Sequence, residues 1–344
     1  MRRLTRTVAA TALVAALALV SACSSGSDSS DSGSGDGSKL RKVTYLTSFG
    51  NFGRDSYAWV AKDKGFFKEA GFEVDIKPGQ GTGGVITTII GGKADFGPID
   101  LTGGILQLGG DDPKNKEFVA VAAIQQRTMA AIVTTQDKGI ASPKDLEGKT
   151  IADTQQSVVR NLFPTYAKLA GVDASKVTWV NGQAQELIGT LAAGKVDGIG
   201  QFVVGAPTVR AVTKKEPVLL PYSDVMTDLY GNALITSKKL AKEEPETVKR
   251  FTAALLKGLE YSLANPKEAG EILAKNVDAA NPQAAAAELE LMAAYVRSSN
   301  SGTAIGALDS GRVAKSIAIL QGAGALKQNI TPDQVVDFSL APKA

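Results

Sequence analysis

The sequence predicts an α/β protein of two lobes, with two crossing hinge strands between the lobes and a helical tail at the C-terminus. Three observations support this prediction. Short apolar runs rich in β-branched residues alternate with helix-like segments as far as Ser237, as is typical of parallel βαβ units. Part of this pattern occurs twice, and beyond Ser237 it gives way to Ala- and Leu-rich stretches. The roughly 300 residues after Ser38 also exceed what one hydrophobic core usually serves.

The expected elements follow from the apolar runs and their spacing. Strands are expected at residues 43–47, 72–76, 94–99, 118–124, 130–135, 150–152, 177–180, 198–204, 218–221 and 232–236. Helices are expected at residues 56–64, 82–90, 101–108, 158–169, 184–193 and 206–213. In the tail, Pro245, Pro266 and Pro282 open or immediately precede amphipathic stretches, because proline is tolerated in the first turn of a helix. Residues 309–321 add another helix.

Two segments about a hundred residues apart resemble each other. Residues 92–97 (GKADFG) and 194–200 (GKVDGIG) each follow a helix-like run. In both, the glycine stands where a positive φ ends a helix, and the apolar residues after it begin a strand. The chain is therefore expected to build one strand–helix–strand unit twice, once per lobe, with chance as the alternative because few residues match.

Two long extended stretches, residues 118–135 and 230–237, lie where the chain is expected to cross between lobes and return. We interpret them as a hinge, because two crossing strands allow the lobes to rotate about a ligand with little change inside either one. The expected boundaries give residues 40–130 and 229–342 to lobe I and residues 131–228 to lobe II. The tail is expected to pack on lobe I.

The N-terminal residues have the pattern of an export signal with a lipid anchor. Three arginines in the first six residues precede an apolar run at residues 8–20, which is too short to span a bilayer. Small residues then lead to Cys23, the single cysteine of the sequence. Residues 1–22 are therefore expected to be a lipoprotein signal peptide, similar to those of bacterial lipoproteins, with a lipidated Cys23 after cleavage. An ordinary secretory signal is the alternative.

A linker is expected between the anchor and the folded part. Residues 24–38 contain only Ser, Gly and Asp, so they offer no apolar surface to offset the entropy of ordering the backbone. Residues 23–39 are therefore expected to be a disordered tether. The folded part is expected to work outside the cytoplasm, anchored to the cell membrane.

Composition excludes several classes of function. Without the signal peptide, basic and acidic residues nearly balance, which argues against a nucleic-acid binder because such proteins need a basic stripe. The sequence has no histidine, so His-dependent triads and zinc sites with His or Cys ligands are excluded. Carboxylates and tyrosines remain able to do acid–base chemistry. We expect no catalytic residue, no metal ligand and no cofactor.

Several motifs, in order along the chain, resemble those of one family. Residues 57–74 (YAWVAKDKGFFKEAGFEV) resemble a helix-to-strand passage of solute-binding proteins for ABC importers. Residues 92–97, 142–151 (SPKDLEGKTI) and 191–197 (LAAGKVD) match the same class, which is named after its NMT1/THI5-like domain and carries nitrate, sulfonates, taurine and thiamine-precursor pyrimidines. The resemblance covers roughly residues 43–263. It implies a periplasmic-binding-protein type II fold, a small-molecule ligand and an ABC permease as partner.

The ligand is expected at the carboxyl ends of strands, where helix N-termini present unpaired N–H groups. This rule selects loops after several of the expected strands. The residues expected to contact the ligand are Phe49, Asn51, Asp55, Tyr57, Thr82, Gly83, Asp100, Gln126, Ser157, Gln201, Tyr230 and Asn232.

These residues also have structural interpretations. Phe49 either stacks on a planar ligand or packs in the core of the lobe. Asp55 either hydrogen-bonds to the edge of the ligand or caps the next helix. The glycine-rich loop at residues 79–84 either cradles an oxyanion or is a turn, and it lacks the Gly-Lys-Ser/Thr of a P-loop. Asp100 is either an N-cap or an acceptor for the ligand.

The sequence therefore predicts a membrane-tethered receptor that closes on a small polar nutrient and delivers it to an ABC permease. A neutral heteroaromatic ligand, such as a thiamine-precursor pyrimidine, is favoured because a strongly anionic ligand usually recruits more arginine. A receptor for sulfonates, taurine or nitrate is the first alternative. The others are a THI5-like biosynthetic enzyme, disfavoured by the missing histidine, and a sensory lipoprotein without a transporter. We expect a monomer that binds no nucleic acid.

Overall fold

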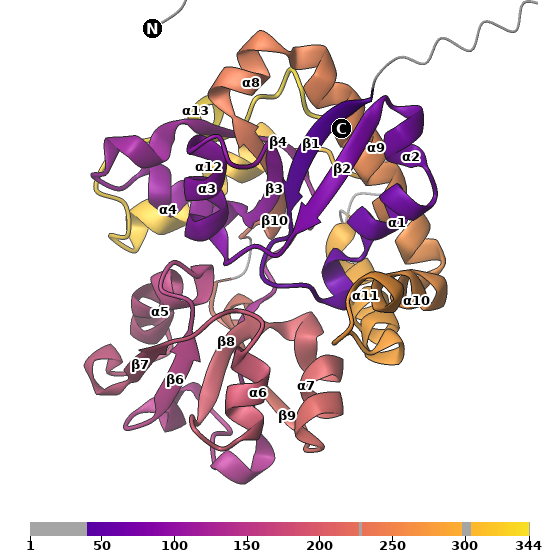
Figure 1. Ribbon diagram of the computed structural model, residues 1–344. Coiled ribbons are helices and arrows are strands. Elements are labelled where there is room, and N and C mark those ends of the chain that lie inside the picture. Colours follow the sequence, from indigo (N-terminus) through magenta and orange to yellow (C-terminus); the bar gives the residue numbers. More distant parts are fainter. Residues whose placement is uncertain (1–39, 227–228, 298–303, 344) are drawn as a thin grey trace, which may run out of the picture. The chain divides into compact units, whose positions relative to one another are not determined.

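The computed structural model describes residues 40–226, 229–297 and 304–343, which build two five-stranded sheets (Figure 1). The first sheet consists, in spatial order, of β2 (Phe72–Lys77), β1 (Arg41–Leu46), β3 (Phe96–Asp100), β10 (Asn232–Ser237) and β4 (Phe118–Ala123). The second consists of β7 (Thr178–Asn181), β6 (Thr150–Asp153), β8 (Gly198–Phe202), β5 (Ala130–Thr135) and β9 (Pro217–Pro221). The predicted signal peptide, Cys23 and the predicted tether lie outside the described residues.

Both sheets have the same plan. Three strands are parallel, as in the β1–β2 register Val43↔Val74 and the β6–β7 register Ile151↔Trp179. A fourth strand, β10 or β5, then joins antiparallel between the parallel set and the sheet edge. Helices connect the parallel strands, so the predicted α/β class is confirmed. We refer to each sheet with its connecting helices as the first and the second lobe.

Helices fill the connections and the tail. The first lobe has α1 (Tyr57–Asp63), α2 (Phe66–Glu69), α3 (Thr82–Ile90) and α4 (Leu101–Leu108), and the second has α5 (Val158–Leu169), α6 (Leu187–Ala192) and α7 (Ala206–Thr213). The tail has α8 (Lys238–Glu243), α9 (Pro245–Ala264), α10 (Pro266–Asn276), α11 (Pro282–Val296), α12 (Ser310–Gly322) and α13 (Pro332–Val335). Short 3-10 turns are η1 (Gly53–Asp55), η2 (Pro113–Lys116), η3 (Gln136–Lys138), η4 (Pro143–Leu146), η5 (Ala174–Lys176), η6 (Val203–Gly205) and η7 (Tyr222–Asp224).

Helix α9 of the tail packs on the first lobe. Phe251 of α9 stacks on Phe96 of β3 with a centroid distance of 4.0 Å and on Phe67 of α2 at 5.1 Å. It also meets Phe72 of β2 edge-on at 5.7 Å. One tail residue therefore joins two strands and a helix of the first lobe through aromatic contacts.

The hinge is shorter than the sequence suggested. β4 and β10 are neighbours within the first sheet, and β5 belongs to the second sheet, so those parts of the expected hinge are sheet strands. The chain crosses between β4 and β5 and returns between β9 and β10, and the two crossings meet where the Thr128 backbone N–H donates to the Leu229 carbonyl (2.8 Å). The exact lobe boundaries stay a prediction. None of the described helices is long and apolar enough to cross a bilayer.

Candidate functional site

The loop between β1 and α1 folds back on a buried carboxylate. The Ser48 backbone N–H and Oγ both donate to Asp55 Oδ1, at 3.0 and 2.9 Å. Burial raises the pKa of Asp55, while Arg54 and the two Ser48 hydrogen bonds act in the opposite direction. Asp55 therefore shapes the loop, and its second oxygen, Oδ2, has no hydrogen-bond partner among the described residues.

Arg54 lies buried in the same loop, although its charge is ordinarily found at a surface. Its guanidinium lies over the rings of Phe52 (4.6 Å) and Phe202 (4.8 Å), which are favourable cation–π positions. Nη2 donates to the Phe49 carbonyl (3.0 Å), and Asp55 Oδ2 and Glu288 Oε2 lie 3.7 and 3.8 Å from other guanidinium nitrogens. Two carboxylates thus compensate the buried charge, as burial of a charge requires.

The glycine-rich loop meets the second lobe through its backbone. Gly81 has φ 83°, and no side chain caps the start of α3 there. The Gly83 N–H donates to the Gln156 carbonyl (3.1 Å), so that group is not free to hold an oxyanion. The Gln80 carbonyl accepts from Thr154 Oγ1 (3.1 Å), and Gln80 Oε1 accepts from the Ala184 N–H (3.2 Å).

Asp100 is the N-cap of α4. Oδ1 accepts from the backbone N–H groups of Thr102 (2.9 Å) and Gly103 (3.2 Å), and Oδ2 accepts from Thr128 Oγ1 (3.0 Å). Burial raises the pKa of Asp100 to about 6, against the opposing effect of these hydrogen bonds. Of the two interpretations, the capping role describes its contacts in this structure.

Three of the predicted site residues, Gln126, Tyr230 and Asn232, lie at the crossings and interact there with other residues of the chain. Gln126 Nε2 donates to the Ala307 carbonyl (3.0 Å), and Gln126 Oε1 accepts from Arg312 Nη1 (2.5 Å). Arg312 lies 4.2 Å over the Tyr230 ring. The Asn232 N–H donates to Gln125 Oε1 (3.0 Å). Both polar groups of the Gln126 side chain are therefore hydrogen-bonded to residues at, or just before, the start of α12.

In the second lobe, the ends of β6 and β8 carry buried polar groups. Ser157 caps α5 by accepting from the Val159 N–H (3.1 Å), and Gln201 Oε1 accepts from the Phe202 N–H (3.0 Å). Asp153 ends β6, and its carboxylate lies over β8 where Gly200 leaves room: a Cβ on Gly200 would be 2.0 Å from Asp153 Oδ2. Burial raises the pKa of Asp153 to about 7.

Seven of the predicted residues lie at the carboxyl ends of strands β1, β2, β6 and β8 or in the segments that directly follow them. Phe49 pairs with Gln80 in an isolated bridge and contacts Phe202 of the second lobe edge-on at 5.8 Å. The seven are Phe49, Asn51, Asp55, Thr82, Gly83, Ser157 and Gln201. Tyr57 lies elsewhere, in the core of the first lobe, where its hydroxyl accepts from Tyr45 Oη (3.1 Å).

Buried polar atoms without a hydrogen-bond partner gather at the same loops. Among the described residues they are Asn51 Oδ1, Arg54 Nε and Nη1, Asp55 Oδ2, Ser56 Oγ, Asp153 Oδ2 and Gln201 Nε2, with Thr252 Oγ1 apart in α9. Buried polar groups are ordinarily hydrogen-bonded. The concentration of exceptions at the carboxyl ends of β1, β6 and β8 therefore points to a ligand site.

The sequence prediction missed several residues of this site. Arg54 directly precedes the predicted Asp55 but is not among the predicted residues, and Glu288 is far away in the sequence. Gln80 and Asp153 lie beside predicted residues, and their position at a strand end was the signal that could have identified them. The described residues contain no group of three or more His, Cys, Asp or Glu side chains placed to hold a metal ion.

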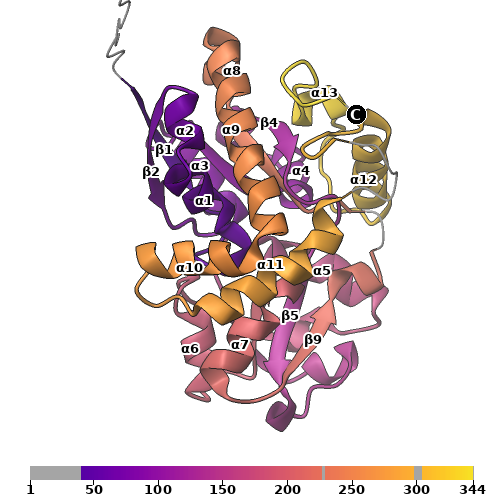
Figure 2. The same ribbon diagram turned by 90° about the vertical axis from the view of Figure 1, so that its right-hand side faces the viewer.

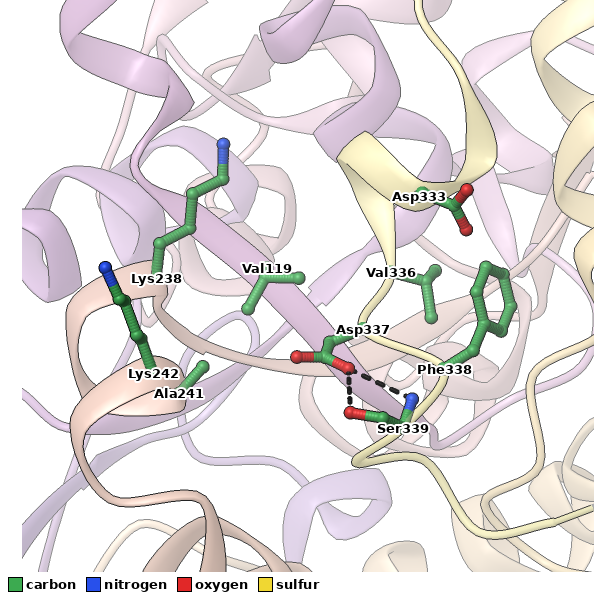
Figure 3. A pocket seen from close by; sticks show the side chains of 9 residues that line it. All are labelled: Val119, Lys238, Ala241, Lys242, Asp333, Val336, Asp337, Phe338 and Ser339. Atoms are coloured by element: carbon green, nitrogen blue, oxygen red, sulfur yellow. Dashed lines mark hydrogen bonds between the residues drawn. The ribbon is translucent and has the colours of Figure 1, made fainter.

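A separate pocket of about 530 Å³ lies at the outer edge of the first sheet (Figure 3). Lys238 and Lys242 of α8 line one side of it, and Asp333 and Phe338 of the C-terminal segment line the other. None of the predicted site residues lines this pocket, so we do not assign the ligand to it.

Comparison with known proteins agrees with the predicted resemblance. The family model described as NMT1/THI5 like matches residues 56–269. The chain belongs to the NMT1/THI5-like family. A formylaminopyrimidine-binding protein from Halalkalibacterium halodurans is 26% identical to this family member over 232 residues, which are 66% of this chain and 68% of the relative.

Solved structures share the fold of this NMT1/THI5-like chain. The alkanesulfonate-binding protein SsuA from Xanthomonas axonopodis pv. citri, bound to MOPS, has a TM-score of 0.66 and 14% identity, covering 88% of this chain and 98% of its own. A ligand-binding component of an ABC-type import system from Staphylococcus aureus, with zinc bound, has a TM-score of 0.62 and 13% identity, covering 88% and 97%. Both confirm the predicted periplasmic-binding-protein fold.

Proposed function

We propose that this chain is the extracytoplasmic solute-binding component of an ABC importer and that it binds a small polar ligand between its lobes. The observation that supports this most is the convergence of loops from both sheets. Gln80 and Gly83 of the first lobe bond to Thr154 and Gln156 of the second, beside Phe202. In a two-lobed fold with a hinge, closure buries a ligand at such a place.

The polar groups of the site favour a ligand that carries N–H donors. Asp55 Oδ2, Asp153 Oδ2 and Asn51 Oδ1 are acceptors without partners, and Gln201 Nε2 is a donor without one. A heteroaromatic ring with an exocyclic amino group supplies donors together with ring acceptors. We therefore propose an aminopyrimidine-like nutrient, a class that also includes the ligand named for the Halalkalibacterium relative.

Arg54 favours the second candidate, a sulfonate- or nitrate-type anion. Its Nε and Nη1 have no hydrogen-bond partner among the described residues, and guanidinium groups bind such oxyanions well. However, Asp55 and Glu288 lie within 4 Å of the guanidinium, so an entering anion would meet two carboxylates. For this reason the neutral ligand ranks first.

A ligand panel tests the proposal. Thermal unfolding is measured with a formylaminopyrimidine, other pyrimidines, flavins, taurine, alkanesulfonates and nitrate. We expect a pyrimidine to stabilise the protein by about 2.7 kcal/mol at a concentration a hundred times its Kd. Stabilisation by the sulfonates or nitrate instead would support the anion candidate. No shift with any compound would contradict both, and chemical conversion of a compound during incubation would indicate an enzyme.

A pair of asparagine variants checks that the ligand occupies this place. Asn51→Ala removes an acceptor that has no partner in the chain, so we expect weaker binding of the stabilising compound with little change in the unligated protein. Asn161→Ala changes an exposed asparagine on α5 and serves as the matched control. Equal affinity in both variants would place the ligand elsewhere.

We further propose that the protein is held at the membrane by a lipid on Cys23. The apolar run, the small residues before Cys23 and the Ser/Gly/Asp tether after it support this proposal. Cys23→Ser is expected to release the protein from the membrane fraction of expressing cells, with no incorporation of labelled fatty acid. Retention of the variant on membranes would contradict a lipid anchor at this residue.

A further inference from the structure

Helix α11 belongs to the tail in sequence, yet it contacts both lobes. It packs against η1 in the first lobe and against α7 and η6 in the second, and Figure 2 shows it beside α7 and α9. The approach to η1 is close, since a Cβ on Gly53 would lie only 2.4 Å from Ala285 Cα. α11 therefore packs directly against the turn that carries Arg54 and Asp55.

Glu288, in the middle of α11, receives hydrogen bonds from both lobes. Its side chain is fully buried. Oε2 accepts from the Arg54 backbone N–H (3.1 Å) and lies 3.8 Å from Arg54 Nη1. Oε1 accepts from Thr208 Oγ1, and Thr208 lies on α7 between strands β8 and β9 of the second sheet. One carboxylate thus joins the ligand loop of the first lobe to a helix of the second.

The Thr208–Glu288 bond differs in kind from the hydrogen bonds that Gln80 and Gly83 make between the lobes. The bonds from Thr154 to Gln80 and from Gly83 to Gln156 join neutral groups to neutral carbonyls. Burial raises the pKa of Glu288, while the Arg54 charge and the hydrogen bonds from Thr208 and Arg54 favour its charged form. Hydrogen bonds to charged groups are stronger than those between neutral groups. Separation of the lobes breaks this bond if α11 moves with η1, α9 and α10 of the first lobe, against which it packs, because Thr208 belongs to the second lobe.

Resting on the proposed function, we propose that Glu288 is a positioning residue of the ligand site: it holds the lobes closed through Thr208 and orients the ligand loop through Arg54. All the atoms involved belong to the chain, so the bond favours the closed arrangement with or without a ligand. Loss of the Thr208 hydroxyl is expected to lower the ratio of closed to open molecules about tenfold or more.

The test measures the separation of the lobes in the ligand-free protein, so it does not depend on knowing the ligand. Spin labels are attached through Lys68→Cys and Lys195→Cys, two exposed positions on different lobes, in the Cys23→Ser background. Distance distributions are then compared by pulsed electron–electron double resonance. In the doubly labelled protein that keeps Thr208, we expect the main population at the closed distance. In the same protein with Thr208→Val, we expect a shift to longer distances. Thr208→Ser, which keeps the hydroxyl, is expected to restore the closed population.

Thr213→Val is the matched control, because its hydroxyl bonds only within the second lobe, to the Val209 carbonyl (2.7 Å) and to the backbone of Lys215. A change in lobe separation caused only by disturbing α7 would appear in this variant too and would overturn the proposal. So would an unshifted distribution in Thr208→Val, or a ligand-free protein that is open without any substitution. If Thr208→Val opens the lobes but no compound of the ligand panel stabilises the protein, the role of Glu288 is supported and only the proposed function fails.

Discussion

At the scale of single residues, Asp95 and Asp197 show how the two halves of the chain repeat each other. Asp95 Oδ2 accepts from the Thr44 N–H (2.8 Å), and Asp197 Oδ2 accepts from the Thr150 N–H (2.9 Å). Each aspartate therefore fixes the start of a parallel strand in its own sheet. The glycines before them, Gly92 and Gly194, have φ of 69° and 72°. The repeated motif thus has a physical basis: a glycine ends the helix and an aspartate sets the register of the strands.

Asp153 leads to a prediction about stability and pH. Burial raises its pKa from 3.8 to about 7, so between roughly pH 4 and pH 7 the folded state binds more protons than the unfolded state. The free energy of unfolding therefore falls as the pH rises through this window. Asp153→Asn has no such proton to lose. We expect the stability of the wild type relative to this variant to fall by about 3 kcal/mol between pH 4.5 and pH 8, as measured by urea unfolding.

An exposed aspartate provides the control for this prediction. Asp278→Asn changes an exposed aspartate, and its stability relative to the wild type is expected to stay constant over the same pH range. Ser157 and Arg160 lower the pKa of Asp153 from what burial alone would give, and the value of about 7 includes their effect. An equal pH dependence in Asp153→Asn and the wild type would show that the carboxyl ionises normally.

At the scale of elements, the sequence was sufficient wherever an element is long and periodic. All ten expected strands are present, and the expected helices at 82–90, 101–108, 158–169 and 206–213 have the bounds of α3, α4, α5 and α7. Helices α2, α8 and α13 were not expected, because four to six residues show no helical period. Tertiary contacts, which no local pattern contains, hold them in place.

Glycine positions give a prediction for individual elements. Gly53→Ala would place a Cβ 2.4 Å from Ala285 Cα, so η1 and α11 must move apart. We expect a loss of about 1–3 kcal/mol, as overpacking usually costs. Gly189→Ala lies on the exposed face of α6 with nothing within 4 Å of the new Cβ, and alanine favours a helix by up to about 1 kcal/mol over glycine. Urea unfolding should therefore move in opposite directions for the two variants. The same sign for both would contradict the close packing of η1 on α11.

At the scale of the whole molecule, the sequence could indicate where a candidate site lies but not all the residues that meet there. Strand ends pointed to Phe49, Asp55 and Gln201, because the carboxyl ends of parallel strands meet at one edge of a sheet. The partners from the tail could not be predicted, since Glu288 and Arg312 meet the site from more than 180 residues away. Such contacts depend on how the tail returns across the lobes, which apolar periodicity does not encode.

The crossing segments provide a prediction for the molecule as a whole. Gly231 lies where they touch: a Cβ there would be 2.3 Å from the Arg127 carbonyl oxygen, which belongs to the other crossing. Gly231→Ala is therefore expected to push the crossings apart, lower the free energy of unfolding by about 1–3 kcal/mol and change the radius of gyration measured by small-angle scattering. Gly322→Ala, with nothing within 4 Å of its Cβ at the end of α12, should not lower the free energy of unfolding and should leave the radius of gyration unchanged. If Gly231→Ala lost stability but kept the scattering profile of the wild type, the crossings would be packed connections that do not set the arrangement of the lobes.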